Sequence, residues 1–275
     1  MIRGVTRAGL GEIGSNEAYI RHAAEFGFQS VDLNPLELTG EYGTAGAAEL
    51  LAHHGVIIGS FGLEADWRGS EDAFREGLPR LVQMAEAAAA LGCTSCGTYI
   101  LPATDLPAAP FMIAATRRLR LCADILGAYG ISLGLEFVGP HHLRTQWANP
   151  TLWTMQDTLD WIDAIHVPHV GLLLDSYHWH TNGLTTSDLL ALRPDQITFV
   201  HINDAKPLPI GELLDSDRLY PGEGAIDLTG FLRSLKHIGY TGVVAQEVLA
   251  PASGESSLEL LARSKAGFDK LFQEL

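Results

Sequence analysis

Hydrophobic runs recur along the whole chain, and amphipathic segments separate them. Eight apolar runs are predicted to form strands: residues 5–10, 30–33, 56–61, 94–100, 131–137, 170–175, 197–202 and 243–248. Most of them are continuous rather than alternating, which is typical of parallel strands that are covered on both faces. The pattern therefore predicts an α/β protein with a parallel sheet.

Helical periodicity fills the intervals between these runs. The predicted helices cover residues 16–26, 45–54, 71–91, 110–129, 151–165, 186–192, 228–237 and 256–272. Several of them end at a glycine that precedes the next strand, namely Gly27, Gly55, Gly92, Gly130 and Gly239. A glycine at this position can adopt the left-handed conformation that caps a helix C-terminus.

Eight strand–helix units in 275 residues predict a single (β/α)8 TIM barrel that spans residues 1–275 as one domain. A doubly wound open sheet is the alternative, but it requires a glycine-rich phosphate turn after the first strand. Segment 7–16, RAGLGEIGSN, only loosely resembles such a turn. The long irregular segment 204–226 follows the seventh strand, so we expect it to cover the catalytic face.

Four polar residues end apolar runs in the second half of the chain: Glu136, Asp175, His201 and Glu247. A charged side chain at the end of a buried strand is costly unless it is paired or binds a metal. The alternative for each carboxylate is that it caps a turn or pairs with an arginine. Because a TIM barrel builds its active site at the carboxyl ends of its strands, we expect the four side chains to meet there. Three carboxylates and one imidazole suit one divalent ion, such as Mn²⁺, Mg²⁺, Co²⁺ or Zn²⁺.

Further polar and aromatic residues are predicted to surround this cluster on the substrate side. His178 lies three residues beyond Asp175, and Arg218 offers a fork of hydrogen-bond donors. Asp204 is interpreted either as a group that orients His201 or binds a substrate hydroxyl, or as a turn residue. His142 is expected to face the pocket, and Trp67 is expected to form part of an apolar wall.

The charge and cysteine content restrict the class of partner. The formal net charge of −15 disfavours nucleic acid and anionic membrane surfaces, so a small molecule is the expected partner. No apolar stretch is long enough to span a bilayer, and the first residues lack the apolar core of a secretory signal. Cys93 and Cys96 form a CxxC within an apparent strand and are interpreted as buried small hydrophobes. These features favour the cytoplasm.

With these motifs the chain resembles the xylose isomerase-like TIM-barrel superfamily of sugar isomerases and epimerases, which also contains endonuclease IV and inosose isomerase-like members. The segments LGLEF, LLLDSYH, FVHINDA, RLYPGEGAIDL and AQEV follow the family's order. The resemblance implies that Glu136, Asp175, His201 and Glu247 hold the metal. It also places His178 and Arg218 beside the substrate, and it is compatible with a homo-oligomer.

One position departs from the family's ketohexose 3-epimerases. These enzymes usually carry a second glutamate six residues after the first ligand, whereas this chain has His142 there. The segment GPHHLRT, residues 139–145, is closer to the inosose isomerase-like members. The resemblance therefore favours a substrate other than a simple ketohexose.

A metal-bound α-hydroxyketone can lose the proton on its hydroxyl-bearing carbon, next to the carbonyl, to give an enediolate. Glu136 and Glu247 would exchange protons with opposite faces of this intermediate, which predicts an isomerase or epimerase of a keto-sugar or keto-inositol. A lyase of the 3-dehydroshikimate, inosose or 3-keto-glycoside type would use the same enolate chemistry. A non-catalytic polyol-binding barrel is a further alternative. A nuclease of the endonuclease IV type is disfavoured by the charge and by the missing additional ligands.

Overall fold

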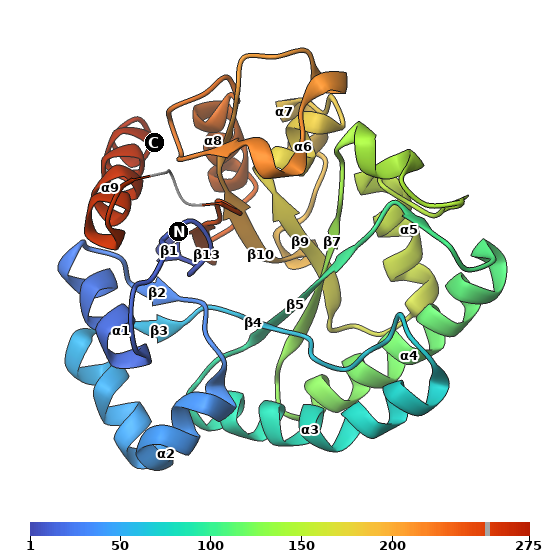
Figure 1. Cartoon of the computed structure of the whole chain (residues 1–275), viewed down its shortest axis with the longest axis horizontal. Coiled ribbons are helices and arrows are strands. Elements are labelled where there is room, and N and C mark those ends of the chain that lie inside the picture. The colour runs from blue at the N-terminus through green and yellow to red at the C-terminus, as the bar shows by residue number, and fades with distance from the viewer. Residues whose placement is uncertain (251–253) are drawn as a thin grey trace.

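A closed ring of parallel strands, surrounded by helices, forms the molecule (Figure 1). The computed structural model describes residues 1–250 and 254–275. The main sheet contains β1 (Ile2–Val5), β2 (Ser30–Val31), β3 (Ile57–Ile58), β4 (Phe61–Gly62), β5 (Ser95–Ile100), β7 (Ser132–Phe137), β9 (Val170–Asp175), β10 (Ile197–Ile202) and β13 (Val243–Gln246). Strands β3 and β4 are the two ends of the sheet order and are only two residues apart in sequence, so the barrel closes between them. The predicted TIM barrel is confirmed.

The first strand is the one whose position was predicted wrongly. It spans Ile2–Val5 instead of residues 5–10, and the following residues form a loop. Arg3 interrupts the apolar run and conceals this strand in the sequence. In the fold its guanidinium points outward, donates to Asp269 Oδ1 at 2.6 Å and lies 4.7 Å from the ring centre of Phe272. Contacts with the C-terminal helix therefore make a charged residue compatible with a buried strand.

The surrounding helices follow the predicted order with changes at their ends, and α6 is an additional short helix that was not predicted. They are α1 (Asn16–Glu25), α2 (Pro35–His54), α3 (Glu71–Ala90), α4 (Ala108–Ala128), α5 (Met155–Ile165), α6 (Ser176–Thr181), α7 (Thr186–Leu190), α8 (Leu228–His237) and α9 (Ser257–Gln273). Helix α2 contains a kink at Gly43 (φ 68°), and the part after the kink matches the predicted helix 45–54. The part before the kink was not predicted; Asn34 caps it and Pro35 fits its first turn. Thr154 caps α5, which therefore begins later than predicted. The five predicted glycine caps have φ angles between 65° and 87°, as expected for left-handed caps.

Short strand pairs and 3₁₀ turns lie in the loops between the main strands and helices. Two antiparallel pairs form, one between β6 (Ala103–Thr104) and β8 (Asn149–Pro150), the other between β11 (Asp204–Ala205) and β12 (Arg218–Leu219). The 3₁₀ turns are η1 (His141–Thr145), η2 (Pro194–Gln196), η3 (Ile210–Glu212) and η4 (Asp215–Asp217). The β11–β12 pair ties both ends of the long loop after β10 together and brings Arg218 back towards the strand ends.

The interior of the barrel is divided into layers by the two-residue period of the strands. A buried apolar cluster inside the barrel consists of Leu173, Phe199, Val243 and Ala245, and Ala245 is paired with His201 in the strand register. A Cβ atom on Gly97 would lie 2.7 Å from Leu173 Cδ1, so glycine at this position makes room for the leucine. Asp175 and His201 lie two residues beyond Leu173 and Phe199, so the polar side chains form the next layer towards the barrel mouth.

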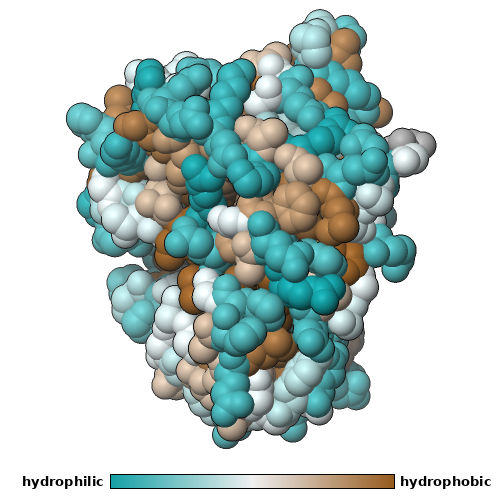
Figure 2. All heavy atoms as spheres, turned by 90° about the vertical axis from the view of Figure 1, so that its left-hand side faces the viewer, coloured by the Kyte–Doolittle hydropathy of each residue, from teal (hydrophilic) through white to brown (hydrophobic). Residues whose placement is uncertain are grey.

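The outer surface is mixed in polarity. On the side that carries α9, α1 and α2, hydrophilic residues are interspersed with smaller hydrophobic areas (Figure 2). The apolar faces of the helices pack inward, as shown by the buried residues Tyr19 and Ile20 of α1 and Phe268 of α9. Among the described residues, no helix combines the length and apolar character needed to cross a bilayer.

Candidate metal centre

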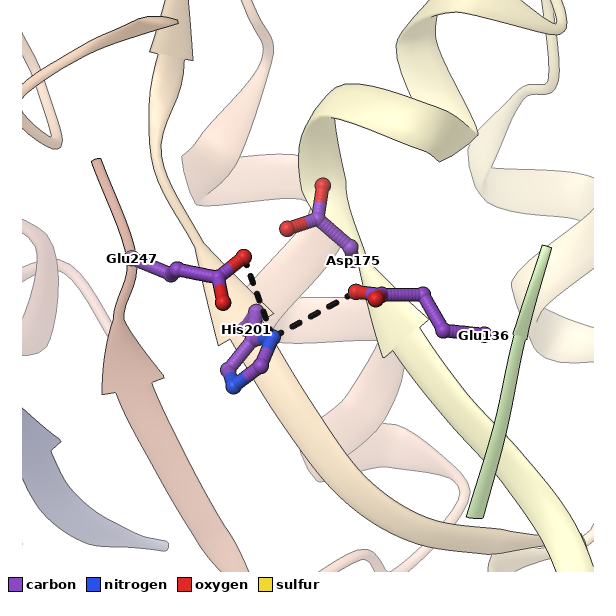
Figure 3. A group of neighbouring side chains, drawn as sticks. All are labelled: Glu136, Asp175, His201 and Glu247. Carbon is purple, nitrogen blue, oxygen red and sulfur yellow. Dashed lines mark hydrogen bonds and ion pairs between the residues drawn. The ribbon is translucent and has the colours of Figure 1, made fainter. Parts of the chain in front are cut away.

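Four side chains converge at the mouth of the barrel from the ends of β7, β9, β10 and β13 (Figure 3). They are Glu136, Asp175, His201 and Glu247, and each offers one potential ligand atom within 4.8 Å of the others. Glu136, Asp175 and His201 are buried, and Glu247 is partly buried. The strand-end pattern in the sequence therefore predicted which side chains would meet.

Asp175 is held rigidly at the junction between β9 and α6. Its Oδ1 caps α6 by accepting hydrogen bonds from the backbone N–H groups of Tyr177 at 2.6 Å and His178 at 3.1 Å. Its Oδ2 accepts from Asn203 Nδ2 at 2.8 Å and from Arg218 Nη1 at 3.1 Å. Burial acts to raise the pKa of Asp175, but Arg218 and nearby imidazoles hold it below its usual value. Asp175 is therefore an ionised and preorganised candidate ligand.

His201 lies between the two glutamates. Its Nδ1 is 3.4 Å from Glu136 Oε1 and 3.4 Å from Glu247 Oε2, as the dashed lines in Figure 3 show. Burial acts to lower the pKa of His201, but the carboxylates of Glu247, Asp32 and Glu136 raise it well above its usual value. Burial and the charge of Glu247 raise the pKa of Glu136. The centre thus concentrates negative charge around one imidazole nitrogen.

Arg218 approaches the cluster from the loop after β10. Its guanidinium donates to Glu247 Oε2 at 2.7 Å and to Asp215 Oδ1 at 2.9 Å, in addition to Asp175. Its Nη2 lies 3.2 Å from Nε2 of His178, whose Nδ1 accepts a hydrogen bond from the backbone N–H of Gly139 at 3.3 Å. Arg218 and His178 therefore border the cluster of four side chains, and the contact with a substrate that the sequence analysis expected of them stays a prediction.

Asp204 has a different role from the predicted contact with substrate or imidazole. Its Oδ2 accepts from the backbone N–H groups of Gly222 and Gly224, and its Oδ1 accepts from those of Ala205 and Ile226. Because four backbone donors engage its carboxylate, Asp204 organises the loop that carries Arg218. Of the two alternatives considered from the sequence, the turn residue describes it.

Trp67 and His142 also lie apart from the cavity beside the cluster. Trp67 is buried, and its Nε1 donates to Thr98 Oγ1 at 3.0 Å while its ring packs near Phe111 and Trp161. The aromatic side chain is thus part of the core behind the cavity wall. His142 lies in η1, and its buried Nδ1 has no hydrogen-bond partner among the described residues.

Two residues that the sequence analysis did not select touch the ligands. Asn203 is fully buried and donates from Nδ2 to both Asp175 Oδ2 and the backbone oxygen of Glu247, at 2.8 and 3.1 Å. Asp32 follows β2, and its Oδ2 lies 3.7 Å from Nε2 of His201. The run SVDL around Asp32 carries the same strand-end signal as the four ligands, but it lies in the first half of the chain.

A cavity of about 430 Å³ opens beside the cluster. Glu136, His201 and Glu247 form part of its lining, and the other lining residues come mostly from the first strands of the barrel: Thr6, Ala8, Asp32, Leu33, Asn34, Ser60, Phe61, Gly62, Leu63, Glu64, Met84, Gly97, Thr98, Tyr99 and Leu173. Its size suits a small organic molecule. Among these described lining residues, none is Lys or Arg.

The donor set fits a divalent cation. Carboxylate oxygens with one imidazole nitrogen match ions of intermediate hardness. The carboxylates around the cluster outnumber the single guanidinium of Arg218, so the described groups leave an excess of negative charge in a buried site. These carboxylates belong to Asp32, Glu136, Asp175, Asp215 and Glu247. A cation bound between the four side chains would offset this excess.

Comparison with known proteins places the chain in a family. The model of the xylose isomerase-like TIM barrel matches residues 20–267. The chain belongs to this family. A solved xylose isomerase domain protein from Alicyclobacillus acidocaldarius is 32% identical, with a TM-score of 0.92 and coverage of 100% of this chain and 99% of that one. The family and fold expected from the motifs are therefore confirmed.

Two further proteins are similar to the chain. An inosose isomerase from Bacillus velezensis is 39% identical over 129 residues, which are 47% of this chain and 44% of that protein. The chain spans about half the length of the curated relatives that it matches most strongly. A solved IolI protein with a bound zinc atom is 24% identical over 100% of this chain and 99% of that one, with a TM-score of 0.83.

Proposed function

We propose that the chain is a divalent-metal-dependent isomerase or epimerase of an uncharged polyol ketone, such as a keto-sugar or keto-inositol. The observation that carries the proposal is the position of Glu136 and Glu247, which flank His201 Nδ1 at 3.4 Å each within the ligand cluster. The similarity to an inosose isomerase supports a keto-inositol as the first substrate to test.

A divalent ion in this centre would act as a Lewis acid towards the carbonyl and adjacent hydroxyl oxygens of the substrate. One of Glu136 and Glu247 removes the proton from the hydroxyl-bearing carbon next to the carbonyl. The other returns a proton to the opposite face or to the neighbouring carbon, because the two carboxylates approach from different strands. Asp175 and Asn203 hold the geometry, since Asp175 is fixed by hydrogen bonds on both of its oxygens.

The cavity supports an uncharged substrate. A phosphorylated sugar is disfavoured, because the described lining contains no Lys or Arg and carries several acidic side chains. These are Asp32, Glu64, Glu136 and Glu247. Carboxylates and the hydroxyls of Thr6, Ser60 and Thr98 accept or donate hydrogen bonds to neutral hydroxyl groups. A polyol therefore complements the lining better than a phosphate ester.

The test combines metal removal with proton exchange. The protein is stripped by a chelator, reloaded separately with Mn²⁺, Co²⁺, Zn²⁺ or Mg²⁺, and incubated with keto-inositols and ketohexoses in D₂O. We expect deuterium to enter the substrate carbon only in the reloaded samples, with an isomeric or epimeric product detected by NMR. A product that absorbs in the ultraviolet would instead assign elimination. Binding of polyols without exchange or product would leave a binding protein and overturn the proposal.

A further inference from the structure

Asp32 occupies an inner-face position of the barrel that completes the polar layer. Ser30 and Asp32 are two residues apart at the end of β2, so both side chains point to the same face. A Cβ atom on Gly59 would lie 2.2 Å from Ser30 Oγ and 3.0 Å from Asp32 Oδ1, which confirms that they share one space inside the barrel. Asp32 also lines the cavity of the candidate centre.

Asp32 and His201 face each other across this space. Asp32 Oδ2 lies 3.7 Å from His201 Nε2, and both side chains are largely shielded from solvent. Asp32 Oδ1 and His201 Nε2 are buried, and neither has a hydrogen-bond partner among the described residues. A buried donor and a buried acceptor without partners are costly, and here the two atoms belong to side chains that face each other. A shortening of about 0.8 Å brings Nε2 and Oδ2 within hydrogen-bond distance.

The opposite ring nitrogen of His201 faces the ligand cluster. Nδ1 is the atom that lies 3.4 Å from both Glu136 and Glu247. An imidazole ligand binds a metal through one nitrogen, and the group that accepts the hydrogen of the other nitrogen determines its tautomer and orientation. Nδ1 of His201 therefore faces the cluster, and Nε2 faces Asp32.

We infer that Asp32 is the positioning residue for His201: it accepts the Nε2 hydrogen, directs the Nδ1 lone pair to the metal and increases the basicity of this ligand. The inference rests on the proposed metal centre and adds a residue to it from the first quarter of the barrel. Asp32 itself does not bind the metal in this assignment. Its contribution reaches the metal through the imidazole.

The experiment measures metal affinity and ligand geometry in the Asp32→Asn and Asp32→Ala variants. Affinity for Zn²⁺ and Co²⁺ is obtained by competition with a chromophoric chelator, and the visible absorption of the Co²⁺ protein reports the coordination geometry. The matched control is Glu64→Gln. Glu64 lines the same cavity, but its carboxylate contacts Asn34 and Arg80 instead of a ligand.

We expect Asp32→Asn to weaken metal binding about 10- to 100-fold and to change the Co²⁺ spectrum. Asp32→Ala should weaken binding further, because the asparagine retains an acceptor oxygen and the alanine does not. The metal-free Asp32→Asn protein should melt no lower than wild type, since the amide removes a buried charge. A purely structural role for Asp32 would lower the melting temperature and leave the spectrum of the bound metal unchanged.

Two results separate failure of this inference from failure of the proposed centre. If wild type binds one metal ion and Asp32→Asn binds it with the same affinity and spectrum as Glu64→Gln, Asp32 does not position His201. If wild type itself binds no metal stoichiometrically, the centre is wrong and the role of Asp32 with it.

Discussion

Glu136 and Glu247 lie on opposite sides of one point at the barrel mouth, each with a carboxylate oxygen 3.4 Å from Nδ1 of His201. Their strands are not neighbours in the sheet, because β9 and β10 separate β7 from β13. Two carboxylates that approach from separate strands can reach different faces of a planar intermediate. The proposed proton transfer between two faces of an intermediate requires such an arrangement.

Replacing either glutamate by glutamine should stop proton exchange. Glu136→Gln and Glu247→Gln retain the size and an oxygen of the side chain but remove the base, so deuterium incorporation should fall about 100-fold or more. NMR of the substrate in D₂O measures it, together with the metal content of each variant. Glu49→Gln, an exposed position on α2, is the control. Exchange at the wild-type rate in metal-loaded Glu136→Gln would remove this residue from proton transfer.

Metal affinity should increase with pH. Burial acts to lower the pKa of His201, but Glu247, Asp32 and Glu136 raise this pKa well above its usual value. Below this raised pKa the imidazole holds a proton that a metal ion must displace, and above it the nitrogen is free to bind. Calorimetric titration with Zn²⁺ between about pH 6 and about pH 9 should show tighter binding and less proton release at the higher pH. Affinity independent of pH would contradict the assignment of His201 as a ligand.

Loss of the Asp204 carboxylate should loosen the loop that carries Arg218. In Asp204→Asn the amide nitrogen replaces one acceptor of the backbone N–H groups of Gly222, Gly224, Ala205 and Ile226. The free energy of unfolding should fall by about 1–3 kcal/mol, measured by urea denaturation. Because Arg218 borders the ligand cluster, KM should also rise.

Asp195→Asn provides the control for this loop variant. Asp195 pairs with Arg193 on the surface, where both side chains are about two-thirds exposed or more, so its loss should change stability by about 0–1 kcal/mol. Equal stability of the Asp204→Asn and Asp195→Asn proteins would show that the four backbone hydrogen bonds do not hold the loop.

The thiols of the three cysteines should be unreactive in the folded protein. Burial raises the pKa of Cys93 and Cys122 to about 12, and it raises the pKa of Cys96 well above its usual value. Since the thiolate is the reactive form, a thiol-specific reagent at neutral pH should react only after unfolding. Absorbance of the released chromophore measures this with and without denaturant. Rapid reaction of the native protein would contradict the interpretation of the CxxC as buried small hydrophobes.

The sequence alone determined the barrel and the four clustered side chains, because both follow from local patterns. Apolar runs that alternate with amphipathic helices specify parallel strands, and the carboxyl ends of such strands meet at one end of a barrel. Glu136, Asp175, His201 and Glu247 could be selected from this rule together with the cost of burying charge. Arg3 shows its limit, since a charged residue inside β1 moved the predicted strand by several residues.

Only the tertiary structure decided what surrounds these four side chains. Asp32 lies beside His201, although the two are more than 160 residues apart in sequence. Asn203 and Asp204 are adjacent in sequence, yet Asn203 contacts Asp175 while Asp204 organises a loop. Adjacent strand residues point to opposite faces, and the partner of each depends on how the loop folds back. Trp67 likewise packs into the core through contacts with distant residues. Such assignments depend on long-range distances that no local pattern encodes.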